Sequence, residues 1–153
     1  MSVAYDVGAF LYPLTVLGRT TGTTAATAAT SIVVDQRTLG QRYHSIKAVV
    51  PFSYVKTSGA AITSVQATMQ HSLTTVSSDF ATLGTAGTAV SVAVGAGTGT
   101  TAGKGVAYAD VSLHNARRYL RLSVVKQRTL ATQALNLIGV LMFGGADENP
   151  PAS

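Results

Sequence analysis

The chain has 153 residues, of which 46% are apolar and only 11% are charged, against a usual charged share of about 25%. Its net charge is +5 and it contains no cysteine, which excludes disulfides and thiolate metal sites. Because a free monomer normally keeps a more charged surface, this composition favours a protein whose surface is covered by other protein.

Residues 1–30 are predicted to form an extended N-terminal arm rather than part of the core. A neutral Thr/Ala stretch occupies residues 20–30, and large apolar side chains gather before it around Pro13, namely Tyr5, Phe10, Leu11, Tyr12, Leu14 and Leu17. We expect such an arm to lie on its own domain or on a neighbour. Asp6 precedes every basic residue, so a secretory signal is not expected.

Residues 31–145 are predicted to form one all-β domain, because Thr, Val and Ala dominate and Gly and Ser/Thr clusters recur at regular spacing. Pro51 should mark an edge, a bulge or a bend, since proline cannot donate to a ladder. About seven to nine strands of ordinary length predict a β-sandwich, of which a jelly roll is one form. The expected strands are residues 31–35, 43–55, 61–73, 88–94, 106–113, 119–126 and 134–145.

Two connections carry specific expectations. Residues 76–84 are expected to form a single helical turn, capped by Ser77 or Ser78, with Phe80 in the core. The glycine-rich residues 95–105 are expected to form a mobile loop, and they lack a phosphate-binding pattern because Gly105 follows Lys104. The last strand is apolar on both faces, which predicts a central or interface-facing position. Residues 146–153 form a polar tail.

No catalytic or metal-binding pattern is visible, and we predict a non-enzymatic protein without a cofactor. His44, His71 and His114 show no ligand spacing, and no nucleophile elbow surrounds a serine. The longest apolar run, near residues 134–143, is too short to span a bilayer, so no membrane partner is expected.

Three arginines fall within five residues, and they are the main candidates for a binding role. Arg117 and Arg118 should end a bend, and Arg121 should lie on the polar face of the following strand, where it could pair with Asp110 or Asp79. Arginine is favoured at protein interfaces, and few aromatic groups are available for stacking nucleic-acid bases. We therefore expect a protein partner rather than nucleic acid. The candidate partner-binding residues are Tyr5, Phe10, Tyr12, Arg19, Arg117, Arg118 and Arg121.

The order of features resembles a known family over residues 31–145. A Thr/Ala-rich segment precedes the first strand, "SSDFATLG" (77–84) interrupts the alternating strands, and "RRYLRLSVV" (117–125) precedes a loop and a closing apolar strand. This is similar to the small capsid cement (decoration) proteins of short-tailed, double-stranded DNA phage heads. The resemblance implies a jelly-roll-like homotrimer, made in the host cytoplasm, that bridges major capsid protein subunits on the outer surface of the virion.

An alternative function stays open at this point. The chain could be a phage tail, neck or host-attachment module, with Tyr5, Tyr12 and Tyr54 stacking on the sugars of a receptor glycan.

Overall fold

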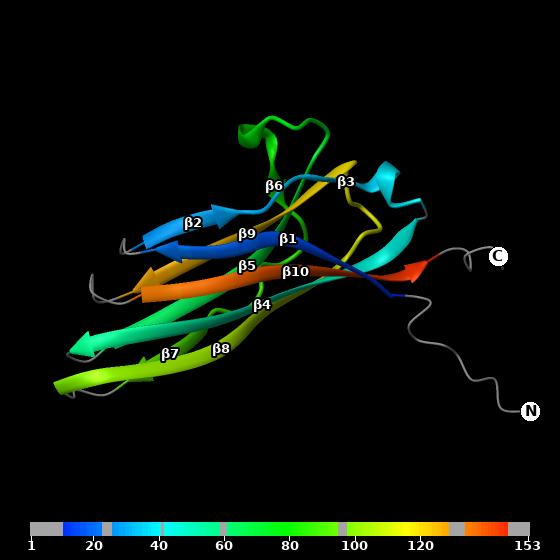
Figure 1. Cartoon of the computed structure of the whole chain (residues 1–153). Helices are drawn as coiled ribbons and strands as arrows, with labels where there is room; N and C mark the ends of the chain where they lie inside the picture. Colours follow the sequence, from blue (N-terminus) through cyan, green and yellow to red (C-terminus); the bar gives the residue numbers. More distant parts are fainter. Residues whose placement is uncertain are drawn as a thin grey trace, which may run out of the picture.

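A computed structural model describes residues 11–22, 26–40, 42–58, 61–94, 98–128 and 134–146. Two antiparallel sheets pack face to face (Figure 1), which confirms the predicted all-β sandwich. None of the helices within those ranges has the length and apolar character needed to cross a membrane.

The first sheet has four strands in the order β1-β10-β4-β8. Their bounds are Leu11–Gly22 for β1, Ala134–Ala146 for β10, Tyr43–Ser58 for β4 and Thr98–Ser112 for β8. We call it the four-stranded sheet. The prediction that the last strand is central is confirmed, because β10 lies between β1 and β4.

The second sheet runs β2-β9-β5, and the short strands β6 and β7 both pair with the far edge of β5, while β3 pairs with β9. The bounds are Ala26–Thr30 for β2, Val34–Asp35 for β3, Ala61–Ser72 for β5, Ala81–Thr82 for β6, Val90–Val94 for β7 and Tyr119–Arg128 for β9.

The strand order is that of a jelly roll. With the two-residue strands β3 and β6 set aside, β1-β10-β4-β8 lies over β2-β9-β5-β7, so strands from the first and second halves of the chain alternate in each sheet. This double Greek-key arrangement pairs the first long strand with the last one. It places residues far apart in sequence side by side on the same face.

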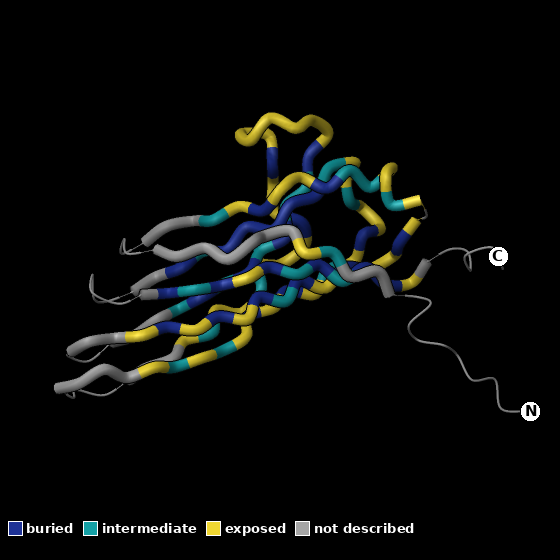
Figure 2. The backbone as a smooth tube through the Cα atoms, viewed as in Figure 1, coloured by how far each residue is buried: buried dark blue, intermediate teal, exposed yellow. Residues whose placement is uncertain are grey.

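The core lies between the sheets and is filled by alternate residues of the facing strands (Figure 2). The predicted alternation of residues 61–73 is confirmed, because Val65, Ala67 and Met69 are fully buried. Strands show this pattern because successive side chains point to opposite faces. The largest fully buried side chains are those of Tyr54, Phe143, Ile46, Met69, Leu120, Leu122, Leu135, Leu137 and Leu141.

Residues 11–22 and 26–30 of the predicted arm are edge strands of the two sheets. They therefore lie on their own domain, one of the two expected positions, but as part of the sandwich and not as a separate segment. Strand β1 pairs with β10, with Leu11 opposite Gly144, and β2 pairs with β9, with Thr30 opposite Ser123. Backbone pairing holds these edge strands, so a Thr/Ala-rich sequence needs little side-chain burial to join a sheet. Residues 1–10 and 147–153 lie outside the described part of the chain.

The glycine-rich segment is also corrected, because residues 98–105 belong to strand β8 rather than to a loop. Gly103 pairs with Tyr54 of β4, and Gly105 pairs with Phe52. A Cβ atom at Gly103 would lie 2.4 Å from the Tyr54 ring, and one at Gly105 would lie 2.5 Å from the Phe52 ring. These glycines therefore serve the core, because aromatic rings from the neighbouring strand fill the space that their side chains would take.

Pro51 lies in the interior strand β4, so the prediction of an edge is wrong there. The β10–β4 pairing runs from Leu137 opposite Phe52 to Val140 opposite Val49, and the positions between them are unpaired without a change of register. Proline has no N–H to donate, so the sheet accepts it at the cost of a short gap in one ladder.

Two shorter elements refine the predictions for the connections. The strand expected at residues 31–35 is limited to Val34–Asp35, and a 3-10 helix follows it at Gln36–Leu39. A second 3-10 helix, Ser77–Asp79, confirms the turn expected at residues 76–84. The N-cap of this second helix is Val76, however, and no serine side chain caps it. Phe80 after it is buried, but it packs on Arg121 at the outward face of the second sheet and is not part of the core cluster between the sheets, which corrects the expected core position.

Candidate interaction surface

The outward face of the four-stranded sheet is apolar in its middle. Cross-strand pairing sets Val106 opposite Pro51 and Tyr108 opposite Val49, and on the other side of β4 it sets Val140 opposite Val49. Val106, Tyr108 and Ile138 are 43%, 53% and 41% exposed. We call the whole group the outer apolar patch: Val49, Pro51, Val106, Tyr108, Ile138 and Val140.

Polar residues border the outer apolar patch along the strands. On one side lie Lys104 and Ser53, which pair with each other across β8 and β4. On the other side, Lys47 forms an ion pair with Asp110 at 3.2 Å, and its ammonium lies 5.3 Å from the centre of the Tyr108 ring. Lys104 is exposed and forms no ion pair within the described residues. The border therefore carries a net positive charge.

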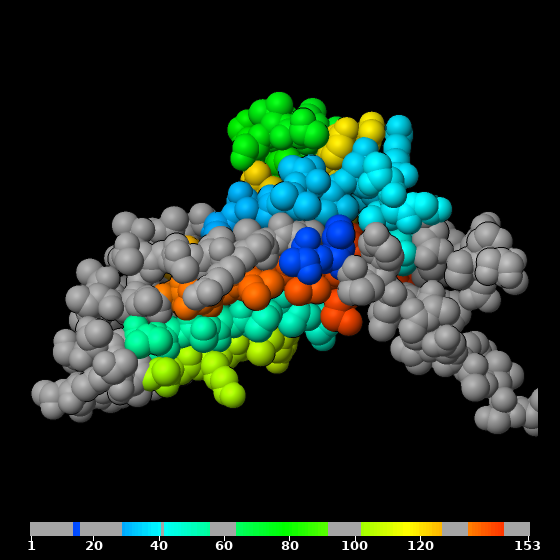
Figure 3. Space-filling view, viewed as in Figure 1, coloured from blue at the N-terminus to red at the C-terminus, as the bar shows by residue number. Residues whose placement is uncertain are grey.

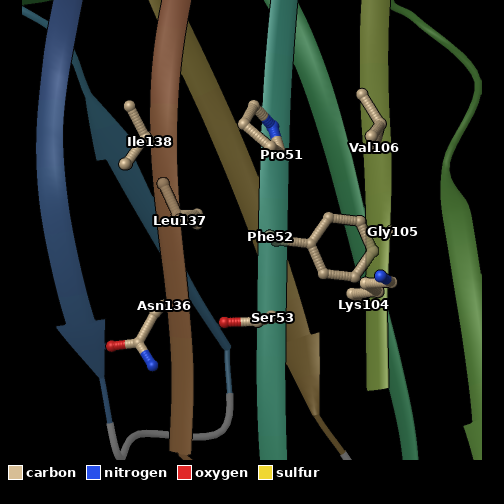
Figure 4. A pocket seen from close by; sticks show the side chains of 9 residues that line it. All are labelled: Pro51, Phe52, Ser53, Lys104, Gly105, Val106, Asn136, Leu137 and Ile138. Atoms are coloured by element: carbon tan, nitrogen blue, oxygen red, sulfur yellow. The ribbon is translucent and has the colours of Figure 1, made fainter.

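An open groove of about 540 Å³ crosses the patch where the pairing is interrupted at Pro51 (Figure 4). Pro51, Val106 and Ile138 line it from three different strands. Ser53, Lys104 and Asn136 supply its polar end. The groove is therefore apolar over most of its length, with a cation at one end.

Arg121 is a buried brace rather than an exposed binding group. The residue is only 8% exposed, its Nε donates to Gln70 Oε1 at 2.7 Å, and its Nη1 donates to Ser77 Oγ at 2.8 Å. The guanidinium also stacks 4.1 Å from the centre of the Phe80 ring. Burial lowers the pKa of Arg121, which nevertheless stays protonated.

The pairing predicted for Arg121 is wrong, because both of the expected carboxylates have other partners. Asp110 pairs with Lys47, and Asp79 accepts a hydrogen bond from Thr74. The reason is that residues 73–80 cross over the outward face of the second sheet and cover Arg121 with hydroxyl, carbonyl and aromatic groups.

Arg118 and Arg117 fix the bend before β9 in different ways. Arg118 forms an ion pair with Asp35, with Nε 3.0 Å from Oδ1, and this hydrogen bond lowers the pKa of Asp35. Arg117 acts through its backbone: its N–H donates to His71 Nδ1 at 3.2 Å, and its carbonyl accepts from Gln36 Nε2 at 2.6 Å. The three arginines therefore do not converge on one basic site.

The contact at His71 predicts a pH dependence of stability. Burial, and then the charge of Arg117, lower the pKa of His71 below 6.5. As pH falls below about 6.5, the unfolded chain takes up this proton before the folded chain does, so the free energy of unfolding should decrease. Urea unfolding between pH 5 and 8 measures this, and a His71→Gln variant should show a smaller decrease. The control is His114→Gln, at an exposed histidine, which should show the same decrease as the wild type. If His71→Gln also lost as much stability between pH 8 and pH 5 as the wild type does, the assignment to His71 would be contradicted.

The remaining predicted binding residues lie mostly where their side chains are not described. Tyr5 and Phe10 fall outside the described residues, and Tyr12 and Arg19 lie at positions of β1 where only the backbone course is described. Tyr54, expected to stack on sugars, is fully buried against Gly103, which corrects that expectation. In the part of the chain that the structure describes, no three His, Cys, Asp or Glu side chains gather to hold a metal ion.

Comparison with known proteins gives likeness of fold only. No family model matches the chain, and no curated protein matches it. The structure of infectious bursal disease virus Gx strain is similar over 92% of this chain and 33% of that one, at 12% identity and a TM-score of 0.49. This chain thus spans about a third of the length of that relative.

Two further structures are similar at lower scores. Desmodium yellow mottle tymovirus covers 93% of this chain and 84% of its own, at 12% identity and a TM-score of 0.31. Eiger TNF from S. frugiperda covers 74% of this chain and 66% of its own, at 13% identity and a TM-score of 0.33. The TM-scores of all three structures lie below 0.5, so no function is taken from them.

Proposed function

We propose that this chain is a non-enzymatic structural protein of a virion, which decorates and stabilises a capsid by bridging neighbouring subunits of the major capsid protein. The observation that carries the proposal is the outer apolar patch. Soluble monomers rarely leave large contiguous apolar patches in water, and such patches mark surfaces that bind protein. A jelly roll alone would not decide between functions, because viral capsid proteins, lectins and cupins share it.

Composition supports a repeated, multivalent contact. With 11% charged residues, the chain can lie against a neighbour without burying many unpaired charges. Its net charge of +5 would favour approach to a negatively charged shell. Many copies on a symmetric lattice can hold firmly even when each contact is weak.

The test is incorporation into particles. Virus particles whose genome encodes this chain, purified on a density gradient, should contain the chain in a fixed copy number. Particles from a deletion strain should bind the purified wild-type chain to saturation, and this binding should raise the temperature at which they release DNA. Val106→Asp, which places a charge in the outer apolar patch, should bind at least about 30-fold more weakly, as expected for a lost interface hot spot.

A matched control is Thr82→Asp, on the exposed strand β6 of the other sheet. It should bind particles like the wild type. Absence of the chain from purified particles would overturn the proposal. The proposal would also be overturned if Val106→Asp left particle binding unchanged and the chain bound a glycan array through the exposed Tyr108. That outcome would favour the host-attachment alternative.

A further inference from the structure

A second apolar surface lies on the loop that follows β5. Residues 73–79 are all exposed, and they project at the upper end of the molecule (Figures 2 and 3). Leu73 is 68% exposed and Val76 is 56% exposed, among the highest values for large apolar side chains in the described residues. We call these two residues the apolar knob.

The loop is held in one shape by its own polar groups. Thr74 N donates to Ser72 Oγ at 3.1 Å, Val76 N donates to Thr74 Oγ1 at 3.3 Å, and Asp79 N donates to the Val76 carbonyl at 3.1 Å. The Thr74 hydroxyl in turn donates to the Asp79 carboxylate. The backbone on both sides of Val76 is therefore fixed.

The second sheet anchors this loop from below. The Arg121 guanidinium donates to both the hydroxyl and the carbonyl of Ser77 and stacks on Phe80. A loop that is ordered before binding loses little conformational entropy when it docks. The fold therefore presents two apolar side chains to solvent on a preorganised support, which is the arrangement of a docking element.

The groove and the knob complement each other in charge as well as in polarity. Asp79 is the only charged residue of the loop 73–79, and it is exposed. Lys104 stands at the polar end of the groove without an ion-pair partner in the described ranges. The groove lies on the outward face of the four-stranded sheet, whereas the loop rises from the second sheet, so one copy can expose both at once.

We propose that the apolar knob of one copy docks into the groove of a second copy, with Asp79 facing the partner's Lys104. The contact joins two different surfaces, so it is heterologous and leaves one knob and one groove free in a dimer. Such contacts close into rings when the rotation between copies permits. The inference rests on the proposed function and narrows it: a second copy of this chain, rather than the major capsid protein, covers the groove within the outer apolar patch, so that the copies link to one another across the capsid. Val106→Asp then weakens particle binding because the copies no longer hold one another.

The test is sedimentation of the purified full chain over a range of concentrations. The wild type should self-associate, whereas Leu73→Asp and Val106→Asp should each weaken association by about 30-fold or more. An equimolar mixture of the two variants should form a dimer that grows no further, because only one intact knob and one intact groove remain. Thr82→Asp is the matched control and should associate like the wild type.

Several outcomes would overturn the inference. One is that the wild type stays monomeric. Another is that the mixture of variants stays monomeric although circular dichroism shows both variants folded. A third is that Leu73→Asp still associates. The last result would indicate patch-to-patch dimers. A monomeric chain that binds particles would overturn this inference alone, and an associating chain absent from particles would overturn only the proposed function.

Discussion

Replacing Gly103 by valine should lower the free energy of unfolding by about 3 kcal/mol, at the upper end of the usual effect of overpacking a core. The added Cβ would lie 2.4 Å from two ring carbons and the hydroxyl oxygen of Tyr54, whose side chain is fully buried and cannot swing into solvent. Either the ring or strand β8 must shift, and both movements disturb the contact between the two sheets. Urea unfolding followed by far-ultraviolet circular dichroism measures the change.

Lys104→Val is the control for this substitution, because Lys104 is the next residue along β8 and points outward. Lys104→Val introduces the same β-branched side chain as Gly103→Val, but on the outward face and not in the core. Stability should therefore change by no more than about 0.5 kcal/mol. If both variants were equally stable, Gly103 would not be a residue that the core requires.

Arg121→Ala should lower the free energy of unfolding by about 2–3 kcal/mol, the upper part of the range for hydrogen bonds to a charged group. The substitution leaves Gln70 Oε1 and Ser77 Oγ without their donor and uncovers one face of Phe80. Residues 73–79 should then exchange their amide hydrogens faster, which hydrogen–deuterium exchange measures.

Arg117→Ala provides the comparison for Arg121→Ala. The Arg117 guanidinium is exposed and forms no ion pair within the described residues, so its removal should change stability by no more than about 0.5 kcal/mol. Arg121→Lys should retain the charge but not the forked hydrogen bonds, so its loss of unfolding free energy should lie between those of Arg117→Ala and Arg121→Ala. Equal losses at Arg117 and Arg121 would contradict the role of Arg121 as a brace.

The class of fold could be predicted because period-two alternation is a local property. Val65, Ala67 and Met69 alternate with polar residues within a single strand, and all three are buried as expected. The same reasoning failed for β8, where Gly103 and Gly105 stand at the inward positions. The rings that complete those positions, Tyr54 and Phe52, lie about fifty residues earlier in the chain, so no local pattern shows them.

The candidate surface was hidden for a similar reason. Pro51, Val106 and Ile138 come from three strands, and none of them indicates an apolar surface within its own segment. Only the pairing of β10, β4 and β8 brings them together on one outward face. The double-sided apolar pattern of residues 134–145 was the one local sign of this surface. The arginine cluster was the stronger feature of the sequence, yet Arg118 and Arg121 are used inside the fold.

A cryo-electron microscopy reconstruction of the particles that carry this chain tests the central claim most directly. The account predicts density for the jelly roll on the capsid, with the outer apolar patch of each copy covered by a neighbouring protein subunit. A reconstruction in which the jelly roll is present and Val106, Tyr108 and Ile138 face open solvent would contradict it.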